Sequence, residues 1–193
     1  MIELKNVTMA YGGKTVFENL SLRLDAPGAY ALLGPSGCGK TTLLHLIAGL
    51  QKPVSGSVLR DESQPVAFCF QEDRLLPWYT VRENIALVLP DALEREEALR
   101  RADMWLERVG LRGEGGSYPA QLSGGMKRRA SLARALAFDA PVLLMDEPFR
   151  ALDENTHQDM LRLVRACAEG KLLILVTHDE KDADGMTRIP FRP

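Results

Sequence analysis

The sequence lacks the features that mark several classes of protein. Its 193 residues contain no apolar run of the roughly 18 to 20 residues that a membrane-spanning helix needs, and the N-terminus has no apolar signal core. Lys and Arg number 24 against 26 Asp and Glu, so no cationic surplus is present to neutralise the phosphates of a nucleic acid. We therefore expect a cytoplasmic protein that does not insert into a membrane and does not bind DNA or RNA.

Cysteine is also scarce, and the sequence shows no internal repeat or low-complexity segment. The three cysteines, Cys38, Cys69 and Cys167, are odd in number and lack the close spacing of zinc ligands, so we expect three free thiols. Apolar residues make up 46% and charged residues 26%, as in ordinary globular chains. Length and composition together predict a single domain over 1–193.

The spacing of apolar residues predicts an α/β fold. Alternation along residues 2–24 predicts antiparallel strands, and the denser run 30–33 predicts a buried strand. Further buried strands are expected at 65–70, 142–145 and 171–176, with helices at 41–50, 123–138 and around 160–167. Buried strands separated by helices indicate a mostly parallel sheet.

A helical insert of about 72–138 interrupts this alternation of strands and helices. Thr80 and Glu83 have the spacing of a capping box, which predicts that a helix begins there. After Pro90, an apolar stripe that includes Ala102 and Leu106 faces away from charged residues, as in an amphipathic helix.

A glycine-rich stretch between a predicted strand and a predicted helix has the GxxxxGK[ST] pattern of a phosphate-binding loop. It consists of Gly34, Pro35, Ser36, Gly37, Cys38, Gly39, Lys40 and Thr41. Glycines let the backbone N–H groups face a phosphate, while Lys40 can reach the β- and γ-phosphates and the Thr41 hydroxyl can bind Mg²⁺. The alternative is a glycine-rich turn with an accidental lysine, but the strand and helix on either side argue for ATP and Mg²⁺.

Two adjacent carboxylates, Asp146 and Glu147, follow the apolar run 142–145. Ligands of open α/β sheets bind at the carboxyl ends of the strands, so Asp146 is a candidate to hold Mg²⁺. We expect Glu147 to point the other way along the pleat and to polarise an attacking water. The alternative, in which the pair only caps a turn, is weakened by the phosphate loop in the same chain.

The sequence Leu122-Ser123-Gly124-Gly125 resembles the signature of the ABC transporter ATP-binding subunits, and its companions follow in the order of that family. The resemblance implies a P-loop NTPase core with an N-terminal antiparallel β subdomain and a helical insert, the ABC ATPase fold. It implies that Tyr11 stacks on adenine, that Gln71 is the Q-loop glutamine and that His178 is the switch histidine. Residues 151–153 resemble the D-loop.

Each of these residues suits a role in binding or hydrolysing ATP. The resemblance implies that Ser123, Gly124 and Gly125 contact the γ-phosphate held by a second copy of the chain, so that ATP lies between two subunits. Gln71 can touch both the metal and the attacking water, and His178 can sense the γ-phosphate. Thr42, the residue after Thr41, completes the set that we expect to bind the nucleotide. Taken alone, Tyr11 would more often be an edge-strand aromatic, and Gln71 or His178 would usually be an ordinary polar residue at a strand end.

The run from Gln71 to Tyr79 resembles that of importer ATPases for nitrate, sulfonate, taurine and thiamine precursors. An apolar patch around Trp78 suits a docking site for permease subunits, which would place the protein on the cytoplasmic face of the cell membrane. Alternatively, Leu75 and Trp78 pack within the helical insert.

The sequence departs from the family pattern in three places. Met126 stands where Gln is usual and lacks its amide, which predicts slow but real ATP turnover. Arg150 precedes the D-loop where Ser is common. Only fifteen residues follow His178, which we expect to weaken a dimer that forms without the permease.

Two other functions compete with an importer ATPase. One is a soluble ABC ATPase of DNA repair, translation or cluster assembly; the absence of a coiled-coil or zinc insert and of a basic surplus argues against it. The other is a nucleotide-binding module without catalysis, against which Glu147 argues.

Overall fold

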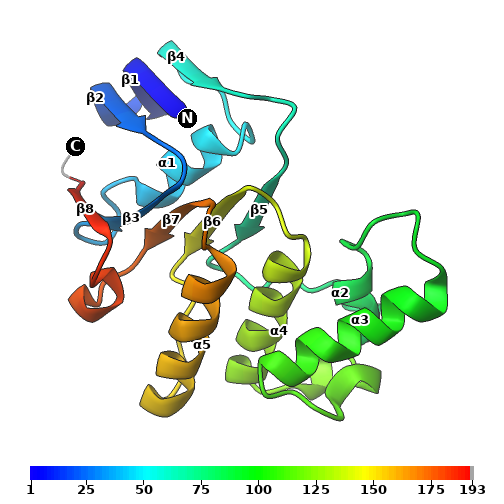
Figure 1. The fold of residues 1–193 in the computed structure, drawn as a ribbon. Coiled ribbons are helices and arrows are strands. Elements are labelled where there is room, and N and C mark those ends of the chain that lie inside the picture. The colour runs from blue at the N-terminus through cyan, green and yellow to red at the C-terminus, as the bar shows by residue number, and fades with distance from the viewer. Residues whose placement is uncertain (192–193) are drawn as a thin grey trace. The chain divides into compact units, whose positions relative to one another are not determined.

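The computed structural model describes residues 1–191, which form two compact units. The first, here called the sheet unit, comprises Met1–Phe68, Pro141–Glu147 and Ala168–Pro193. The second, the helical unit, comprises Cys69–Ala140 and Pro148–Cys167. Figure 1 shows the elements of both units in chain order.

A three-stranded antiparallel sheet opens the chain. It consists of β1 (Ile2–Tyr11), β2 (Lys14–Leu24) and β4 (Ser55–Arg60), in the order β2-β1-β4. Gly12 and Gly13 join β1 to β2 with φ angles of 54° and 82°. A two-residue hairpin loop with positive φ at both positions favours glycine there. The antiparallel strands predicted from alternation over 2–24 are confirmed.

The second sheet of this unit has five strands. They are β3 (Gly28–Leu33), β5 (Val66–Cys69), β6 (Val142–Asp146), β7 (Leu172–Val176) and β8 (Thr187–Pro190), in the order β5-β6-β7-β3-β8. The pairs β6·β7, β7·β3 and β3·β8 are parallel, and every residue of β6 and β7 is buried. The mostly parallel sheet is therefore confirmed. The strand β8 was not foreseen, because Thr187–Pro190 is short and largely exposed.

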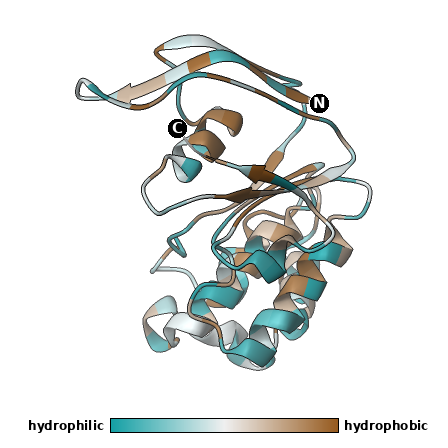
Figure 2. Ribbon diagram, turned by 90° about the vertical axis from the view of Figure 1, so that its left-hand side faces the viewer, coloured by the Kyte–Doolittle hydropathy of each residue, from teal (hydrophilic) through white to brown (hydrophobic). Residues whose placement is uncertain are grey.

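Helix α1 (Lys40–Ile47) lies between the two sheets, as Figure 2 shows. Its Leu43, Leu44 and Ile47 side chains are fully buried in one apolar cluster with residues of both sheets, including Leu4 and Ile174. Burying a Leu or Ile side chain contributes about 1.5–3 kcal/mol, so this cluster fixes the start of α1 against the end of β3. The loop between β3 and α1 is thereby held at both ends.

Four helices and two short 3₁₀ turns make up the helical unit. The helices are α2 (Val81–Ala86), α3 (Arg95–Arg108), α4 (Gly124–Ala137) and α5 (Glu154–Cys167), and the turns are Glu114–Gly116 and Pro119–Gln121. The structure adds α5 to the predicted insert of 72–138, because α5 packs against α4. A third 3₁₀ turn, Glu180–Ala183, belongs to the sheet unit.

The capping box predicted at the start of α2 is confirmed. The Thr80 Oγ1 accepts a hydrogen bond from the Glu83 N–H at 3.3 Å, and the Glu83 carboxylate accepts one from the Thr80 N–H at 2.9 Å. The backbone donor of Thr80 is the main reason that the pKa of Glu83 is lowered. Within residues 1–191, none of the helices combines the length and the apolar character needed to cross a membrane.

Candidate functional site

The predicted phosphate loop runs from the end of β3 to the start of α1, and its shape depends on glycine. Gly37 and Gly39 have φ angles of 76° and 101°. A Cβ atom on Gly39 would lie 2.6 Å from the Cγ1 of Val16 in β2, so a side chain there would collide with the antiparallel sheet. Gly39 also begins α1 without a side-chain cap, and the first turn holds no acidic residue. The backbone N–H groups at this helix start are therefore suited to an anion.

Lys40 is the cation of this loop, and only 6% of it is exposed. Its ammonium donates hydrogen bonds of 2.8 Å to the carbonyl oxygens of Gly34 and Pro35. The loop thus folds around the lysine head. The ammonium also donates to the Sγ of Cys38 at 3.8 Å, so the partners named here are groups of its own loop, and a polyphosphate ligand would offer it a charged partner in their place.

Thr41 and Asp146 lie side by side, although 105 residues separate them in the chain. The Thr41 hydroxyl donates a 2.7 Å hydrogen bond to Oδ2 of Asp146, whose carboxylate ends β6 and is 1% exposed. A hydroxyl and a carboxylate at one point supply the hard oxygen ligands that Mg²⁺ prefers. The hydroxyl oxygen of Thr41 and the carboxylate oxygens of Asp146 are therefore suitable ligands for magnesium.

Glu147 and His178 form a second contact at the same edge of the sheet. Glu147 Oε1 lies 2.6 Å from Nε2 of His178, which follows β7 by two residues. The Glu147 N–H is bonded to the carbonyl of Val176 at 3.0 Å. Glu147 has a φ of 47°, so its direction comes from a left-handed turn after β6 and not from the pleat of the strand.

Tyr11 occupies the last position of β1, and 46% of it is exposed. Its hydroxyl donates a short hydrogen bond of 2.5 Å to the side chain of Gln51. An exposed ring anchored through its hydroxyl offers a face for stacking. Its role toward adenine stays a prediction.

The other predicted residues belong to the helical unit. Gln71 follows β5 by two residues, and its backbone carbonyl accepts a hydrogen bond from Arg128 at 3.3 Å. Ser123 is the N-cap of α4 and accepts a hydrogen bond from the Met126 N–H at 3.3 Å. Gly124 and Gly125 form the first turn of that helix. A serine and two glycines at a helix start present a hydroxyl and backbone N–H groups, as the sequence suggested.

The loop around Trp78 is held in place by a buried amide. Asn84 is 0% exposed, and its side chain bonds the N–H and the carbonyl of Leu76 and the carbonyls of Tyr79 and Thr80, at 2.7–3.2 Å. Trp78 nevertheless remains 67% exposed. The alternative in which Trp78 packs within the helical insert is therefore wrong.

One protein-family model matches most of the chain. The family model described as "ABC transporter" matches residues 17–150. The chain belongs to the ABC transporter family. The resemblance found from the signature and its companion motifs is thus confirmed.

Relatives within the ABC transporter family match most of the chain. The aliphatic sulfonates import ATP-binding protein SsuB 1 of Pseudomonas syringae pv. syringae is 42% identical over 186 residues, which are 95% of this chain and 76% of that protein. The taurine import ATP-binding protein TauB of Escherichia coli O157:H7 is 40% identical over 192 residues, 95% of this chain and 75% of that protein. Both belong to the importer group that the run after Gln71 resembles.

A solved structure of an ABC cassette has the same fold. The dimeric, post-hydrolysis ATP-binding cassette MJ0796, bound to ADP and Pi, superimposes with a TM-score of 0.87 at 33% identity. The match covers 95% of this chain and 90% of that one. The ABC ATPase fold expected from the sequence is confirmed.

Two residues that support the ABC motifs were missed in the sequence. Asn84 gave no signal beyond a polar residue in a short helix. Arg128 was one of several arginines in α4, yet it is 3% exposed and bonded to backbone carbonyls. A polar residue on the apolar face of a predicted helix would have been the signal for both.

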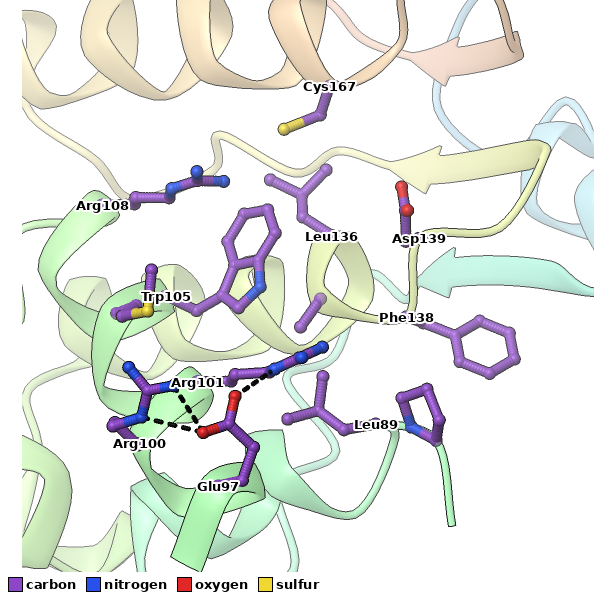
Figure 3. A pocket seen from close by; sticks show the side chains of 13 residues that line it. Leu89, Glu97, Arg100, Arg101, Trp105, Arg108, Leu136, Phe138, Asp139 and Cys167 are labelled. Carbon is purple, nitrogen blue, oxygen red and sulfur yellow. Dashed lines mark hydrogen bonds and ion pairs between the residues drawn. The ribbon is translucent and has the colours of Figure 1, made fainter. Parts of the chain in front are cut away.

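A cavity of about 630 Å³ between α3 and the end of α4 contains none of the predicted site residues. Figure 3 shows Trp105 among the residues that line the cavity, and Glu97 paired with both Arg100 and Arg101. These two pairings, with Arg101 first, lower the pKa of Glu97. The residues expected to bind ATP therefore lie at the phosphate loop and not in this cavity.

Proposed function

We propose that this chain is the ATP-binding and ATP-hydrolysing subunit that energises an ABC importer. The observation that carries the proposal is the pair of contacts at the sheet edge, Thr41 with Asp146 and Glu147 with His178, beside a phosphate loop. A loop that only bound a nucleotide would have no use for a second carboxylate paired to a histidine.

Lys40 is proposed to bind the triphosphate through its ammonium group. Its ammonium is bonded to two neutral carbonyl oxygens of its own loop, and phosphate oxygens carry charge, so they form stronger hydrogen bonds with it. The backbone N–H groups of residues 36–42, at the end of the loop and the start of α1, complete the cradle. Tyr11 stacks on the adenine in this proposal.

Thr41 and Asp146 would hold Mg²⁺, with Gln71 as a further ligand. Magnesium, when bound, draws negative charge from the β- and γ-phosphate oxygens. The 2.7 Å hydrogen bond between Thr41 and Asp146 orients both oxygens toward one point beforehand.

Glu147 is proposed to act as the general base. Its carboxylate takes a proton from a water as the water oxygen attacks the γ-phosphorus, and the bond from that phosphorus to the β–γ bridging oxygen breaks. An ionised carboxylate only accepts hydrogen bonds, so the Nε2 of His178 carries the proton in their 2.6 Å contact. That one N–H can serve either Glu147 or a γ-phosphate oxygen, and we propose that ATP binding moves it to the phosphate and frees Glu147 for water.

The active unit in this proposal is a pair of identical chains. Each chain already has a phosphate loop, so the exposed Ser123 and Gly124 and the partly buried Gly125 at the start of α4 are left for the nucleotide of the second copy. The related cassette whose structure was solved with ADP and Pi is a dimer, which supports the pairing. The sheet unit and the helical unit would then serve as one ATPase domain over 1–193.

Permease subunits are the proposed second partner, and they would hold the protein at the cytoplasmic face of the cell membrane. The exposed Trp78 projects from a loop that Asn84 fixes, a combination typical of an aromatic contact residue at an interface. The relatives named for sulfonate and taurine import support transport into the cell.

Phosphate release by the purified chain, with and without the Glu147→Gln substitution, tests the proposal. The amide keeps the size of the carboxylate but cannot accept the proton, so we expect the turnover rate to fall by about 100-fold or more while ATP is still bound. The variant should also accumulate an ATP-bound dimer on size-exclusion chromatography.

Glu180→Gln is the matched control, because Glu180 also follows β7 and its carboxylate lies 3.8 Å from Arg188. The Glu180→Gln variant should keep the wild-type rate. Chelation of magnesium should abolish phosphate release in the wild type and in both variants. Equal rates in the wild type and in Glu147→Gln would contradict the proposed role of Glu147. Release that continues without magnesium would contradict the metal site.

A further inference from the structure

Arg128 is a buried cation one turn into α4, the helix that begins at the signature serine. Only 3% of the residue is exposed, and its neighbours along the same helix, Ala130, Ser131 and Leu132, are equally buried. Burying a charge is costly unless hydrogen bonds compensate for it. The partners of Arg128 therefore indicate why a cation occupies this position.

The guanidinium of Arg128 joins two loops. Its Nε donates a 3.0 Å hydrogen bond to the carbonyl of Pro148, the residue that follows Glu147 in the chain. Its Nη1 donates to the carbonyls of Phe70 and Gln71, at 2.5 Å and 3.3 Å, and lies 3.6 Å from the Asp73 carboxylate. One planar group thus holds the backbone of Gln71 and the backbone next to Glu147.

A second arginine of the same helix continues this arrangement. Arg134 donates to the carbonyls of Asp73 and Arg74, at 3.0 Å and 2.7 Å. Four of the five carbonyls in residues 70–74 therefore accept hydrogen bonds from α4. A displacement of α4 has to carry the segment around Gln71 with it.

We propose that Arg128 is a positioning residue for ATP hydrolysis, which ties the backbone of Gln71 and of Pro148 to the helix that carries the signature serine. It acts on Gln71 directly and on Glu147 through Pro148, the next residue in the chain. The inference rests on the proposed function, because positioning for hydrolysis has meaning only if the chain hydrolyses ATP.

The chemistry of the side chain explains why arginine suits this position. The guanidinium is planar and presents donors in fixed directions, so it can bond carbonyls of two separate segments at once. A lysine ammonium is a single point on a flexible stem, and a glutamine amide has two donors on one nitrogen. Neither can reproduce bonds from Nε on one side and Nη1 on the other.

Steady-state ATPase kinetics of Arg128→Gln and Arg128→Lys test the proposal. A displacement of about 1 Å at a catalytic group can cost about 100-fold in rate, so we expect kcat to fall between about 10- and 100-fold in both variants. The KM for ATP should change less than about threefold, since the phosphate loop lies outside the altered contacts. If Arg128→Gln does not fold, the lysine variant, which keeps the charge beside Asp73, decides the matter.

Leu106→Ala is the matched control for a purely structural loss. Leu106 is 1% exposed on α3 in the same helical unit and bonds to neither Gln71 nor Pro148. The cavity left by the substitution should lower the melting temperature. The kcat of the folded protein should stay within about twofold of wild type.

A double-mutant cycle with Gln71→Ala separates positioning from general damage. If Arg128 acts through Gln71, adding Arg128→Gln to Gln71→Ala should lower kcat much less than the product of the two single effects. Effects that multiply, or a folded Arg128 variant with kcat within twofold of wild type, would overturn the inference. A wild-type chain without Glu147-dependent phosphate release would instead overturn the proposed function, before any Arg128 variant is measured.

Discussion

The two units of the protein hold their functional residues by different means. In the sheet unit, the ends of the strands deliver side chains that bond directly to one another, as Thr41 does to Asp146 and Glu147 to His178. In the helical unit, Gln71 and Trp78 lie on loops whose backbone is held by other side chains. Asn84 supports the loop of Trp78, and Arg128 supports Gln71.

This difference separates side chains fixed by strand ends, in the sheet unit, from loops that can shift, in the helical unit. Parallel strands place their ends in register, so the side chains proposed for catalysis at these ends contact one another directly. A loop held by one buried amide or guanidinium moves with the element that carries that group. Substitutions in the sheet unit should therefore act directly on nucleotide binding and chemistry, and those in the helical unit should act through the positions of loops, on stability, coupling or turnover.

The largest effect is expected at Lys40, the centre of the phosphate loop. Lys40→Met keeps an unbranched side chain but removes the ammonium, and hydrogen bonds to charged groups contribute about 1.5–3 kcal/mol each. We expect the Kd for ATP to rise by about 100-fold or more, measured by titration with a fluorescent ATP analogue. Lys52→Met, at an exposed position, is the control and should bind as wild type does. A shift below threefold at Lys40 would mean that the loop grips phosphate through its backbone alone.

Asn84 should show the largest effect on stability in the helical unit. Asn84→Ala removes four hydrogen bonds and leaves buried backbone groups of Leu76 without their partner. Because an unpaired buried group costs about 1–3 kcal/mol, we expect the free energy of unfolding in urea to fall by about 2–3 kcal/mol. The exposed Asn155, changed to Ala, should lose less than about 0.5 kcal/mol. Equal losses at the two positions would show that the amide does not fix the Trp78 loop.

Features that depend on adjacent residues could be predicted from the sequence, and features that depend on distant contacts could not. The phosphate loop, the acidic pair and the capping box of Thr80 and Glu83 follow local rules, in which a few adjacent residues determine the structure. The fold followed from buried runs at regular intervals. These features need no knowledge of distant contacts.

Other features depend on contacts between segments far apart in the chain. Glu147 was expected to take its direction from a strand pleat, but the strand ends at Asp146 and a left-handed residue turns the chain. The roles of Asn84 and Arg128 come from carbonyl groups, which every residue has and which no motif identifies. The edge strand Thr187–Pro190 forms because β3 offers it a partner.

Trp78 should affect coupling without affecting stability. The side chain is 67% exposed and its loop is fixed through Asn84, so Trp78→Ala should leave the unfolding midpoint and the basal ATPase rate unchanged. Loss of a central aromatic contact costs about 1.4–2 kcal/mol at an interface, which predicts about a 10- to 30-fold weaker association with the permease subunits. Transport in proteoliposomes that contain those subunits measures the effect, with the exposed Tyr118 changed to Ala as the control. Loss of ATP binding in Trp78→Ala would contradict the docking role.

The smallest effect is expected at Met126, in the first turn of α4. Its backbone N–H already bonds to Ser123, so the start of the helix does not depend on the side chain. Met126→Gln would add an amide that can form one neutral hydrogen bond to the second copy, a contribution of about 0.5–1 kcal/mol. We expect phosphate release to become about two- to fivefold faster, whereas Met104→Gln on the exposed face of α3 should change nothing. A slower Met126→Gln variant would show that methionine is suited to this position, and that the signature of this chain works through its serine and glycines alone.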